Sequence, residues 1–390
     1  MSWSAESVWP KTVFVDAAAK EDALTKRILS RLPNVDVIEL AEGSGDPISQ
    51  RGQLQEPNIE LSDPARFTLA KRALYLTRYQ GNWLKSCPGT SDHVCCNLWI
   101  VNPGEGCPMD CTYCYLQSYL RRNPTSKLYT NTTDMLSAIL AQANKEPSRL
   151  FRIGTGELMD SLVWDPLTDL SCELVPFFAR VPNLMLELKT KSANVENLLK
   201  LKNEHQGKTV VSWSVNARTI SENDEAFTAR LEERVQAAEK VVEAGYKVGF
   251  HFDPLVSFPG WQDEYRDTIK LIFSRIKPEQ VAWVSVSSLR YQQEMQDMMM
   301  ARFPKSTLPF GEQFLAKDRK LRYIQPLRFQ LIQFVWDELK SYGVELPVYM
   351  CMESSTAWRT IAGAPPSAGE ELREVFSRRG RLPILQQKSC

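Results

Sequence analysis

The stretch that decides the fold is GCPMDCTYCYLQ, residues 106–117. Its cysteines, Cys107, Cys111 and Cys114, form the pattern C-x3-C-x2-C directly after a short apolar run at 98–101 that favours a β-strand. Three thiolates on one tight loop can bind three corners of a cubane 4Fe-4S cluster, whereas most such clusters have four cysteine ligands. The loop therefore predicts a metal cluster after a strand, with one iron left for a non-cysteine ligand.

Outward from this loop, strand-like and helix-like segments alternate. Five more β-rich apolar runs follow, at 150–153, 184–188, 210–215, 248–252 and 281–286. Helix-like segments between them include 133–145, 226–244 and 261–276. Such alternation predicts βαβ units and a parallel sheet, which right-handed crossovers can roll into a partial barrel. We expect an α/β fold, a partial (β/α)6 TIM-type barrel, with the chemistry at the carboxyl ends of its strands.

The remaining chain predicts two flanking parts. Residues 1–85 hold a short βαβ-like pattern and form a small N-terminal α/β lobe, and residues 86–290 form the barrel. Residues 291–390 form a C-terminal extension on the substrate side and a tail, with one more strand at 346–351. A length of 390 residues suits two or so domains.

Composition excludes several classes of protein. Lys plus Arg and Asp plus Glu are 47 each, so the net charge of zero excludes a strongly basic nucleic-acid coat but permits a local basic groove. The sequence contains no run of 18 apolar residues, so we expect no membrane span, and the start of the chain lacks the pattern of a signal peptide. Nine cysteines, an odd number, argue against a disulfide framework, so we expect a reducing, cytoplasmic location.

Other readings of the cysteines stay open. A zinc site could use three of the loop cysteines with His93 or another thiol, although zinc sites usually show two separated C-x2-C pairs. The further cysteines Cys87, Cys95 and Cys96, together with Cys351, could hold a second cluster or a zinc ion, act as a thiol relay, or simply be buried.

The motif and its placement resemble the radical S-adenosylmethionine superfamily, and the chain from about 85 to 355 further resembles the spore photoproduct lyase family. The strings that carry this resemblance are CPGT at 87–90, CC at 95–96, CPMDCTYCYLQSYL at 107–120, RIGTGELMDSL at 152–162, LELKTKSANVENLL at 186–199, SWSVN at 212–216, AGYKVGFHFDPL at 244–255 and PGW at 259–261. The resemblance implies a lyase that cleaves S-adenosylmethionine to a 5′-deoxyadenosyl radical, which abstracts hydrogen from a thymine dimer during DNA repair.

The resemblance also implies roles for particular residues. Cys107, Cys111 and Cys114 would bind the cluster, and Tyr113 would lie where the backbone meets adenine. Further candidates for binding S-adenosylmethionine are Gly154, Gly156 and Glu157 of the GTGE string for the methionine ammonium, Lys191 or Lys189 for its carboxylate, and Ser214 and Asn216 for the ribose hydroxyls.

One position departs from the family. Glu157 occupies the place of the family cysteine that returns a hydrogen atom to the substrate radical, and a carboxylate cannot donate a hydrogen atom. Cys351 is our main candidate for another donor, with Cys87, Cys95 and Cys96 as alternatives, and Tyr115 would relay the radical. Cys172 falls in a helix-like run and is expected in the core.

The substrate side is less defined. The segment KDRKLRYIQPLRF at 317–329 mixes five cations with aromatic residues, so it could contact phosphates and stack on a base, or form an amphipathic surface. Asp253 could hold the substrate or ribose, or have a structural role. Besides DNA, we expect a reductant such as flavodoxin or ferredoxin as partner. The alternatives are radical modification of RNA, a peptide or a small metabolite, and a metal-stabilised binding protein without turnover.

Overall fold

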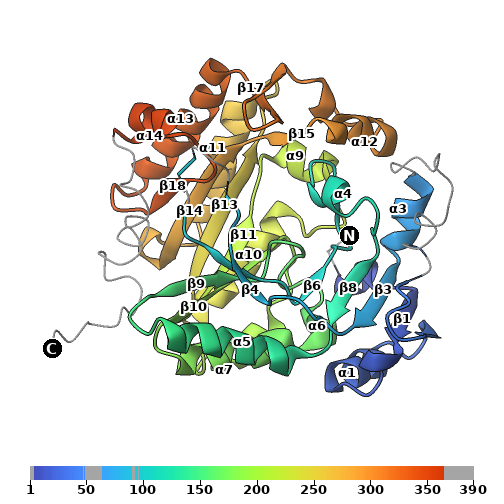
Figure 1. The fold of residues 1–390 in the computed structure, drawn as a ribbon. Coiled ribbons are helices and arrows are strands. Elements are labelled where there is room, and N and C mark those ends of the chain that lie inside the picture. Colours follow the sequence, from blue (N-terminus) through green and yellow to red (C-terminus); the bar gives the residue numbers. More distant parts are fainter. Residues whose placement is uncertain (1–3, 47, 49–63, 90–92, 95, 364–390) are drawn as a thin grey trace.

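The computed structural model describes residues 4–46, 48, 64–89, 93–94 and 96–363, and its main feature is a curled eight-stranded sheet (Figure 1). The strand order is β18-β14-β13-β11-β10-β9-β5-β4. The bounds are β4 (Leu84–Ser86), β5 (Trp99–Val101), β9 (Phe151–Gly154), β10 (Leu184–Thr190), β11 (Thr209–Ser214), β13 (Lys247–Leu255), β14 (Val281–Ser288) and β18 (Val348–Met350). Each neighbouring pair is parallel except β4 with β5. The predicted α/β class and partial barrel are confirmed.

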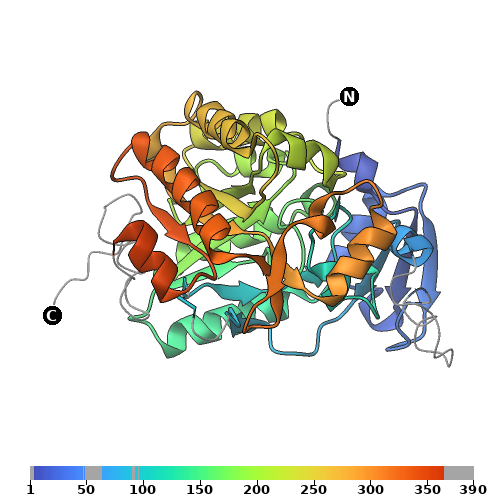
Figure 2. The same cartoon turned by 90° about the horizontal axis from the view of Figure 1, so that it is seen from above.

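Helices cover the outer face of this sheet (Figure 2). They are α5 (Thr132–Lys145), α7 (Leu170–Arg180), α8 (Glu196–Lys200), α10 (Leu231–Glu243), α11 (Trp261–Phe273) and α13 (Gln325–Ser341). Three further helices pack on other elements: α9 (Arg218–Asn223) on α11, α14 (Ser355–Ala362) on α13, and α6 (Asp165–Thr168) on the N-terminal helix Ala23–Arg31. All six residues of β11 are buried, as expected for a parallel strand covered on both faces. Cys172 lies half-buried on α7 and packs against the main core. Among the described residues, no helix is long and apolar enough to cross a membrane.

A second sheet forms the N-terminal lobe, and later parts of the chain complete it. Its order is β2-β1-β3-β8-β6. The bounds are β1 (Thr12–Asp16), β2 (Asp36–Leu40), β3 (Ala73–Thr77), β6 (Gly104–Glu105) and β8 (Ser126–Tyr129), with α1 (Ala23–Arg31) and α3 (Pro64–Ala70) as helices. Because β6 and β8 flank the cysteine loop, both ends of that loop are anchored in this second sheet, while the preceding strand β5 belongs to the eight-stranded sheet. The division of the chain at residues 85 and 290 stays a prediction.

The C-terminal extension contains elements that local sequence patterns did not indicate. A small antiparallel sheet has the order β15-β17-β16, with β15 (Arg290–Gln292), β16 (Gln313–Leu315) and β17 (Lys320–Tyr323). The helix α12 (Glu294–Arg302) packs near α4 (Leu116–Tyr119), and the Ser118 hydroxyl donates to Gln292 at 2.7 Å. The extension therefore lies beside the cysteine loop. The predicted tail from residue 364 onward lies outside the described residues.

One predicted helix begins later than expected. The pattern from 226 to 244 predicted a continuous helix, but Glu225–Ala226 form the short strand β12, which pairs with β7 (Asp110–Cys111). The helix α10 begins only at Leu231. The predicted start was wrong because this long-range pairing with the cysteine loop outweighs local helical periodicity.

A buried polar network crosses the inside of the half-barrel. The Glu187 carboxylate accepts hydrogen bonds from Arg152 at 2.6 and 3.0 Å. It also accepts from Ser212 at 3.0 Å and Trp283 at 3.1 Å, and it lies 2.9 Å from the His251 ring. Burial alone would raise the pKa of Glu187, but the charge of Arg152 and the hydrogen bond with His251 outweigh burial and lower it. One ionised carboxylate thus joins five neighbouring strands.

We predict that Glu187→Gln lowers the free energy of unfolding by about 3 to 5 kcal/mol, because it leaves the buried Arg152 without its charged partner. Since the folded-state pKa of Glu187 is lowered, its ionisation stabilises the fold above the unfolded pKa of about 4.5, and this stabilisation is lost as pH falls. Urea denaturation at several pH values measures both effects.

The control is Asp263→Asn, which removes the carboxylate of an exposed pair with Arg266 and should change the unfolding free energy by less than about 1 kcal/mol. Equal stability of the Glu187→Gln variant and the wild type at pH 7 would contradict the proposed importance of the network.

Candidate functional site

The cysteine loop follows a path fixed by neighbouring backbone. Its strand β7 pairs with β12, and the Thr112 amide donates to the Asp224 carbonyl at 2.8 Å. Gly106 has a φ of +82°, and a Cβ atom there would lie 2.8 Å from the Cα atom of Ser126. Only glycine fits this position without strain, so the entry to the loop is set by its packing against β8.

Side chains from outside the loop bind its carbonyl groups. The Lys71 ammonium donates to the carbonyl oxygens of Cys107 at 2.6 Å and Met109 at 2.7 Å. The Gln117 amide donates to the carbonyl oxygens of Cys111 and Thr112 at 3.2 and 2.8 Å. The shape of the loop therefore does not depend on bonds made by its thiols, and it is preorganised to present three sulfur ligands.

The three loop cysteines lie close to the core, with Cys111 buried and Cys107 and Cys114 half-buried. Burial raises the pKa of Cys107 to about 12 and that of Cys111 well above its usual value, and charge on Cys114 would raise both further. The cations Lys71 and Lys191 act in the opposite direction. Thiolates here need positive charge close by, and a cationic iron cluster supplies that charge. The donor set and its surroundings therefore fit a 4Fe-4S cluster.

No group of three or more His, Cys, Asp or Glu side chains in the described part of the chain could hold one metal ion. A cubane differs from a single ion because each cysteine binds a different iron atom, so the three thiols do not have to converge on one point. Leu116, Leu120 and Leu158 pack against Cys107 and Cys114 and shield this side of the loop.

A second buried network connects the loop to the end of β10. The Tyr113 hydroxyl donates to Glu225, whose carboxylate lies 2.6 Å from the Arg234 guanidinium. The Lys191 ammonium lies 5.4 Å from the centre of the Tyr113 ring. Burial lowers the pKa of Lys191, but the charges of Glu225 and Cys111 outweigh it and raise this pKa. The structure thus brings the predicted residues Tyr113 and Lys191 together and places the cationic Lys191 beside the cysteine loop.

The GTGE string lies where β9 ends. A Cβ atom on Gly156 would lie 3.1 Å from both the Lys189 Cβ and the Ser161 Oγ, so the backbone here is tightly packed against β10. The Glu157 carboxylate accepts from Asn102 at 3.2 Å and lies 3.4 Å from the Lys85 ammonium. The Tyr115 hydroxyl donates to the Glu157 carbonyl at 2.5 Å, so these two predicted residues are in contact.

Sequence reasoning missed Asp160, Glu225 and Arg234. Asp160 accepts from the Thr190 hydroxyl at 2.7 Å and from the Lys191 amide at 2.7 Å, and it also caps the turn that follows GTGE. It therefore sets the position of Lys191. The only signal for Asp160 in the sequence was its place just after GTGE, and nothing local marked Glu225 or Arg234.

The remaining predicted residues lie at neighbouring strand ends. Ser214 ends β11, and its carbonyl accepts from Arg234 at 3.0 Å. Asn216 is buried, and its amide is already bonded to the Pro254 carbonyl at 3.0 Å and the Tyr265 hydroxyl at 2.8 Å. Asn216 therefore holds the ends of β11 and β13 together, and its contact with ribose stays a prediction.

Asp253 and Cys351 lie on the far side of the barrel mouth. Asp253 pairs with Arg290 at 3.1 Å. Cys351 follows β18, and its side chain is hydrogen-bonded to Cys96. Cys87 follows β4, and Cys95 lies outside the described residues. Cys96 and Cys351 therefore meet in space, and neither belongs to the cysteine loop.

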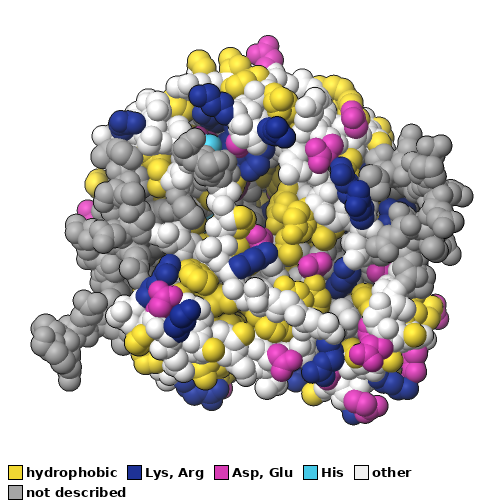
Figure 3. Space-filling model, viewed as in Figure 1, with side chains coloured by type: hydrophobic (Ala, Val, Ile, Leu, Met, Phe, Trp, Pro, Cys, Tyr) yellow, Lys and Arg dark blue, Asp and Glu magenta, His cyan; other side chains and the backbone are white. Residues whose placement is uncertain are grey.

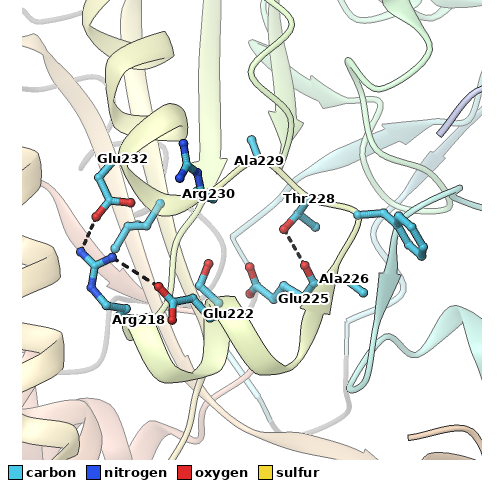
Figure 4. Close-up of a pocket in the computed structure, with 11 residues that line it drawn as sticks. Arg218, Glu222, Glu225, Ala226, Thr228, Ala229, Arg230 and Glu232 are labelled. Carbon is cyan, nitrogen blue, oxygen red and sulfur yellow. Dashed lines mark hydrogen bonds and ion pairs between the residues drawn. The ribbon is translucent and has the colours of Figure 1, made fainter. Parts of the chain in front are cut away.

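The face of the molecule seen in Figure 3 is hollowed near its centre, and hydrophobic side chains gather along the hollow. A separate pocket of about 300 Å³ lies beside Glu225, between α9 and the start of α10 (Figure 4). Arg218 at its rim contacts both Glu222 and Glu232, so the charges of this rim largely cancel (Figure 4). The concave side of the sheet, rather than this pocket, gathers the predicted site residues.

The family model and the curated relatives that match this chain carry the same description. A family model described as spore photoproduct lyase matches residues 8–341. Among curated relatives, the spore photoproduct lyase of Geobacillus sp. (strain Y412MC61) is 28% identical over 216 residues, which cover 55% of this chain and 63% of the relative. That of Bacillus subtilis (strain 168) is 28% identical over 211 residues, covering 53% and 61%. The chain thus aligns with less than two thirds of the length of these two relatives.

Solved structures share the fold. A structure of spore photoproduct lyase complexed with dinucleoside spore photoproduct has a TM-score of 0.74 at 22% identity, and the match covers 87% of this chain and 98% of that one. A single-residue variant of spore photoproduct lyase has a TM-score of 0.76 at 21% identity, covering 90% and 100%. The partial barrel and its flanking elements are therefore an arrangement known from solved structures.

We predict that Lys71→Met lowers cluster retention by about 10-fold, because Lys71 positions the carbonyl groups beside Cys107 and favours its thiolate. Iron and sulfide per chain, measured after anaerobic reconstitution and desalting, give the result. Lys145→Met, on an exposed face of α5, is the control and should retain iron as the wild type does. Wild-type retention by the Lys71→Met variant would show that this lysine has no part in holding the cluster.

Proposed function

This chain belongs to the spore photoproduct lyase family, and on that basis we propose that it is a radical S-adenosylmethionine lyase that repairs a thymine dimer in DNA. The observation that carries the proposal is the preorganised loop of three cysteines, one buried and two half-buried, placed beside Lys191 and the GTGE turn. The similarity to enzymes named spore photoproduct lyase supports the choice of substrate.

In this proposal Cys107, Cys111 and Cys114 hold the 4Fe-4S cluster. When bound, the cluster and S-adenosylmethionine supply a reductive cleavage that yields a 5′-deoxyadenosyl radical. Lys191 offers a cation to the methionine carboxylate, and the GTGE turn at Gly154 and Gly156, packed closely on β10, offers carbonyl and carboxylate oxygens to the methionine ammonium. The leucines that cover Cys107 and Cys114 exclude water from this side of the site.

The return of a hydrogen atom to the substrate needs an O–H or S–H bond near the mouth of the barrel. The Tyr115 side chain is partly exposed, but desolvation around its hydroxyl group and the nearby Glu157 charge raise its pKa, so the phenol stays protonated at neutral pH. The hydrogen bond between Cys351 and Cys96, together with burial, raises the pKa of Cys351 well above its usual value, so its S–H bond is also retained. We assign the donor role to Cys351 and the relay role to Tyr115, since Glu157 has no hydrogen atom to give.

The β16–β17 hairpin offers a surface for DNA. Phe314 and Leu315 are exposed at its end, and Lys317 and Arg319 are exposed in its turn. Cations in this position can contact phosphates, while apolar side chains can enter a base stack and favour extrusion of the lesion. Arg322, which belongs to the same segment, is buried against Asp318 and has a structural role.

The second candidate is the same radical chemistry on RNA, a peptide or a small metabolite, and Glu157 at the place of the family cysteine favours it. In both cases we propose a reductant such as flavodoxin or ferredoxin and a cytoplasmic location, because seven described cysteines carry no disulfide and the cluster needs a reducing environment.

The proposal predicts thymine recovery together with 5′-deoxyadenosine when the anaerobically reconstituted chain, dithionite and S-adenosylmethionine are incubated with DNA carrying the spore-type thymine dimer. Cys111→Ala should abolish both products because one cluster ligand is lost. Cys172→Ser, a change on α7 away from the site, should retain both.

Deoxyadenosine without repaired thymine in the wild-type chain would reject the thymine dimer and favour the second candidate. A normal yield of 5′-deoxyadenosine from the Cys111→Ala variant would contradict the assignment of the cluster.

The hairpin makes a separate prediction about DNA binding. Lys317→Ala and Arg319→Ala should each weaken binding to duplex DNA and reduce the slope of log affinity against log salt by about 1, because each removes one phosphate contact. Fluorescence anisotropy at several salt concentrations measures this slope. Lys270→Ala, an exposed change on α11, is the control, and an unchanged slope in both hairpin variants would exclude the hairpin as the DNA surface.

A further inference from the structure

The two ends of the curved sheet are joined by a contact outside its strand pairing. In the sheet order, β18 lies at one end and the β4–β5 hairpin at the other. The segment before β5 reaches the segment after β18, where His93 and Ser354 form an antiparallel bridge. The Val94 amide donates to the Glu353 carbonyl at 3.1 Å. The open side of the half-barrel is therefore closed by a very short stretch of backbone pairing.

Two thiols lie at this junction. The Cys96 and Cys351 side chains are hydrogen-bonded to each other, and the Cys351 amide is fixed to the Val286 carbonyl at 3.1 Å. Both residues are half-buried, and neither is in a disulfide. Because the surrounding backbone pairing already holds the two segments together, the thiols need only a small movement to form a bond.

We propose that Cys96 and Cys351 are a redox-active pair, whose disulfide joins the two ends of the curved sheet. A low-molecular-weight disulfide is the oxidant. One thiolate of the pair attacks it, forms a mixed disulfide and releases one thiol. The second thiolate then attacks the mixed disulfide, so that the Cys96–Cys351 bond forms and the second thiol leaves. Two electrons pass to the oxidant, and the two protons of the pair end on the released thiols.

Oxidation has a consequence for catalysis, which rests on the proposed function. A disulfide carries no S–H bond, so the oxidised chain cannot return a hydrogen atom from Cys351. The cysteine loop lies elsewhere and keeps its ligands. Oxidation of the pair should therefore separate formation of 5′-deoxyadenosine, which continues, from recovery of thymine, which is lost. The disulfide itself does not depend on the identity of the substrate.

The test uses the anaerobically reconstituted full chain. It is incubated with a series of oxidised glutathione concentrations, quenched with acid, blocked with N-ethylmaleimide, digested and analysed by mass spectrometry. We expect the peptides of Cys96 and Cys351 to appear as a linked pair that dithiothreitol separates, while the visible absorbance of the cluster persists. Cys172→Ser should give the same linkage, and Cys96→Ser should instead leave glutathione attached to Cys351.

Recovery of Cys96 and Cys351 as separate N-ethylmaleimide adducts, at oxidant concentrations that modify Cys87 or Cys172, would overturn the proposal. Linkage of Cys351 to a different cysteine would do the same. The peptide analysis needs no substrate, so a chain that fails to repair the dimer tests the proposed function alone. Undiminished thymine recovery by the fully linked chain would reject the catalytic consequence.

Discussion

The buried carboxylate of Glu187 is the interaction on which the site depends. Its partners Arg152, Ser212 and His251 lie on three other strands, each two residues before a predicted site residue. Because side chains alternate along a strand, Gly154, Ser214 and Asp253 lie on the same face, one layer nearer the barrel mouth. Lys189 stands in the same relation to Glu187 itself, and Lys191 follows two residues further along the chain, just after β10 ends. The network, one side-chain layer further from the barrel mouth, therefore sets the relative positions of the strand ends that carry the predicted site residues.

Much of the fold could be predicted because the information is local. The apolar runs predicted seven of the eight strands of the curved sheet, all but β4, and the spacing of the cysteines identified the loop. What could not be predicted depends on pairing between distant segments. The strand β12, the completion of the N-terminal sheet by β6 and β8, and the β16–β17 hairpin each leave no periodic signal, because each strand is short or binds a partner far along the chain.

The candidate site divides in the same way. Residue types at strand ends indicated Lys191 and Glu157, whose positions follow from the strands themselves. The sequence could not indicate that the Asn216 amide group is hydrogen-bonded to Pro254 and Tyr265, because these contacts depend on how β11 and β13 end side by side. The sequence also could not show that the Arg319 side chain is exposed in a turn whereas the Arg322 side chain, three residues later, is buried. Burial of a charged side chain is decided by its tertiary partners.

The N-terminal sheet has a consequence for synthesis of the chain. Strands β1, β2 and β3 leave the ribosome first, but their neighbour β8 ends only at Tyr129, beyond the cysteine loop. Until then β3 exposes an unpaired edge, which is a template for aggregation. Once β8 docks, the chain between β6 and β8 is closed into a loop whose two ends are anchored in the N-terminal sheet. Assembly of the N-terminal lobe thus fixes both ends of the cysteine loop before most of the barrel, including the loop's partner β12, has been translated.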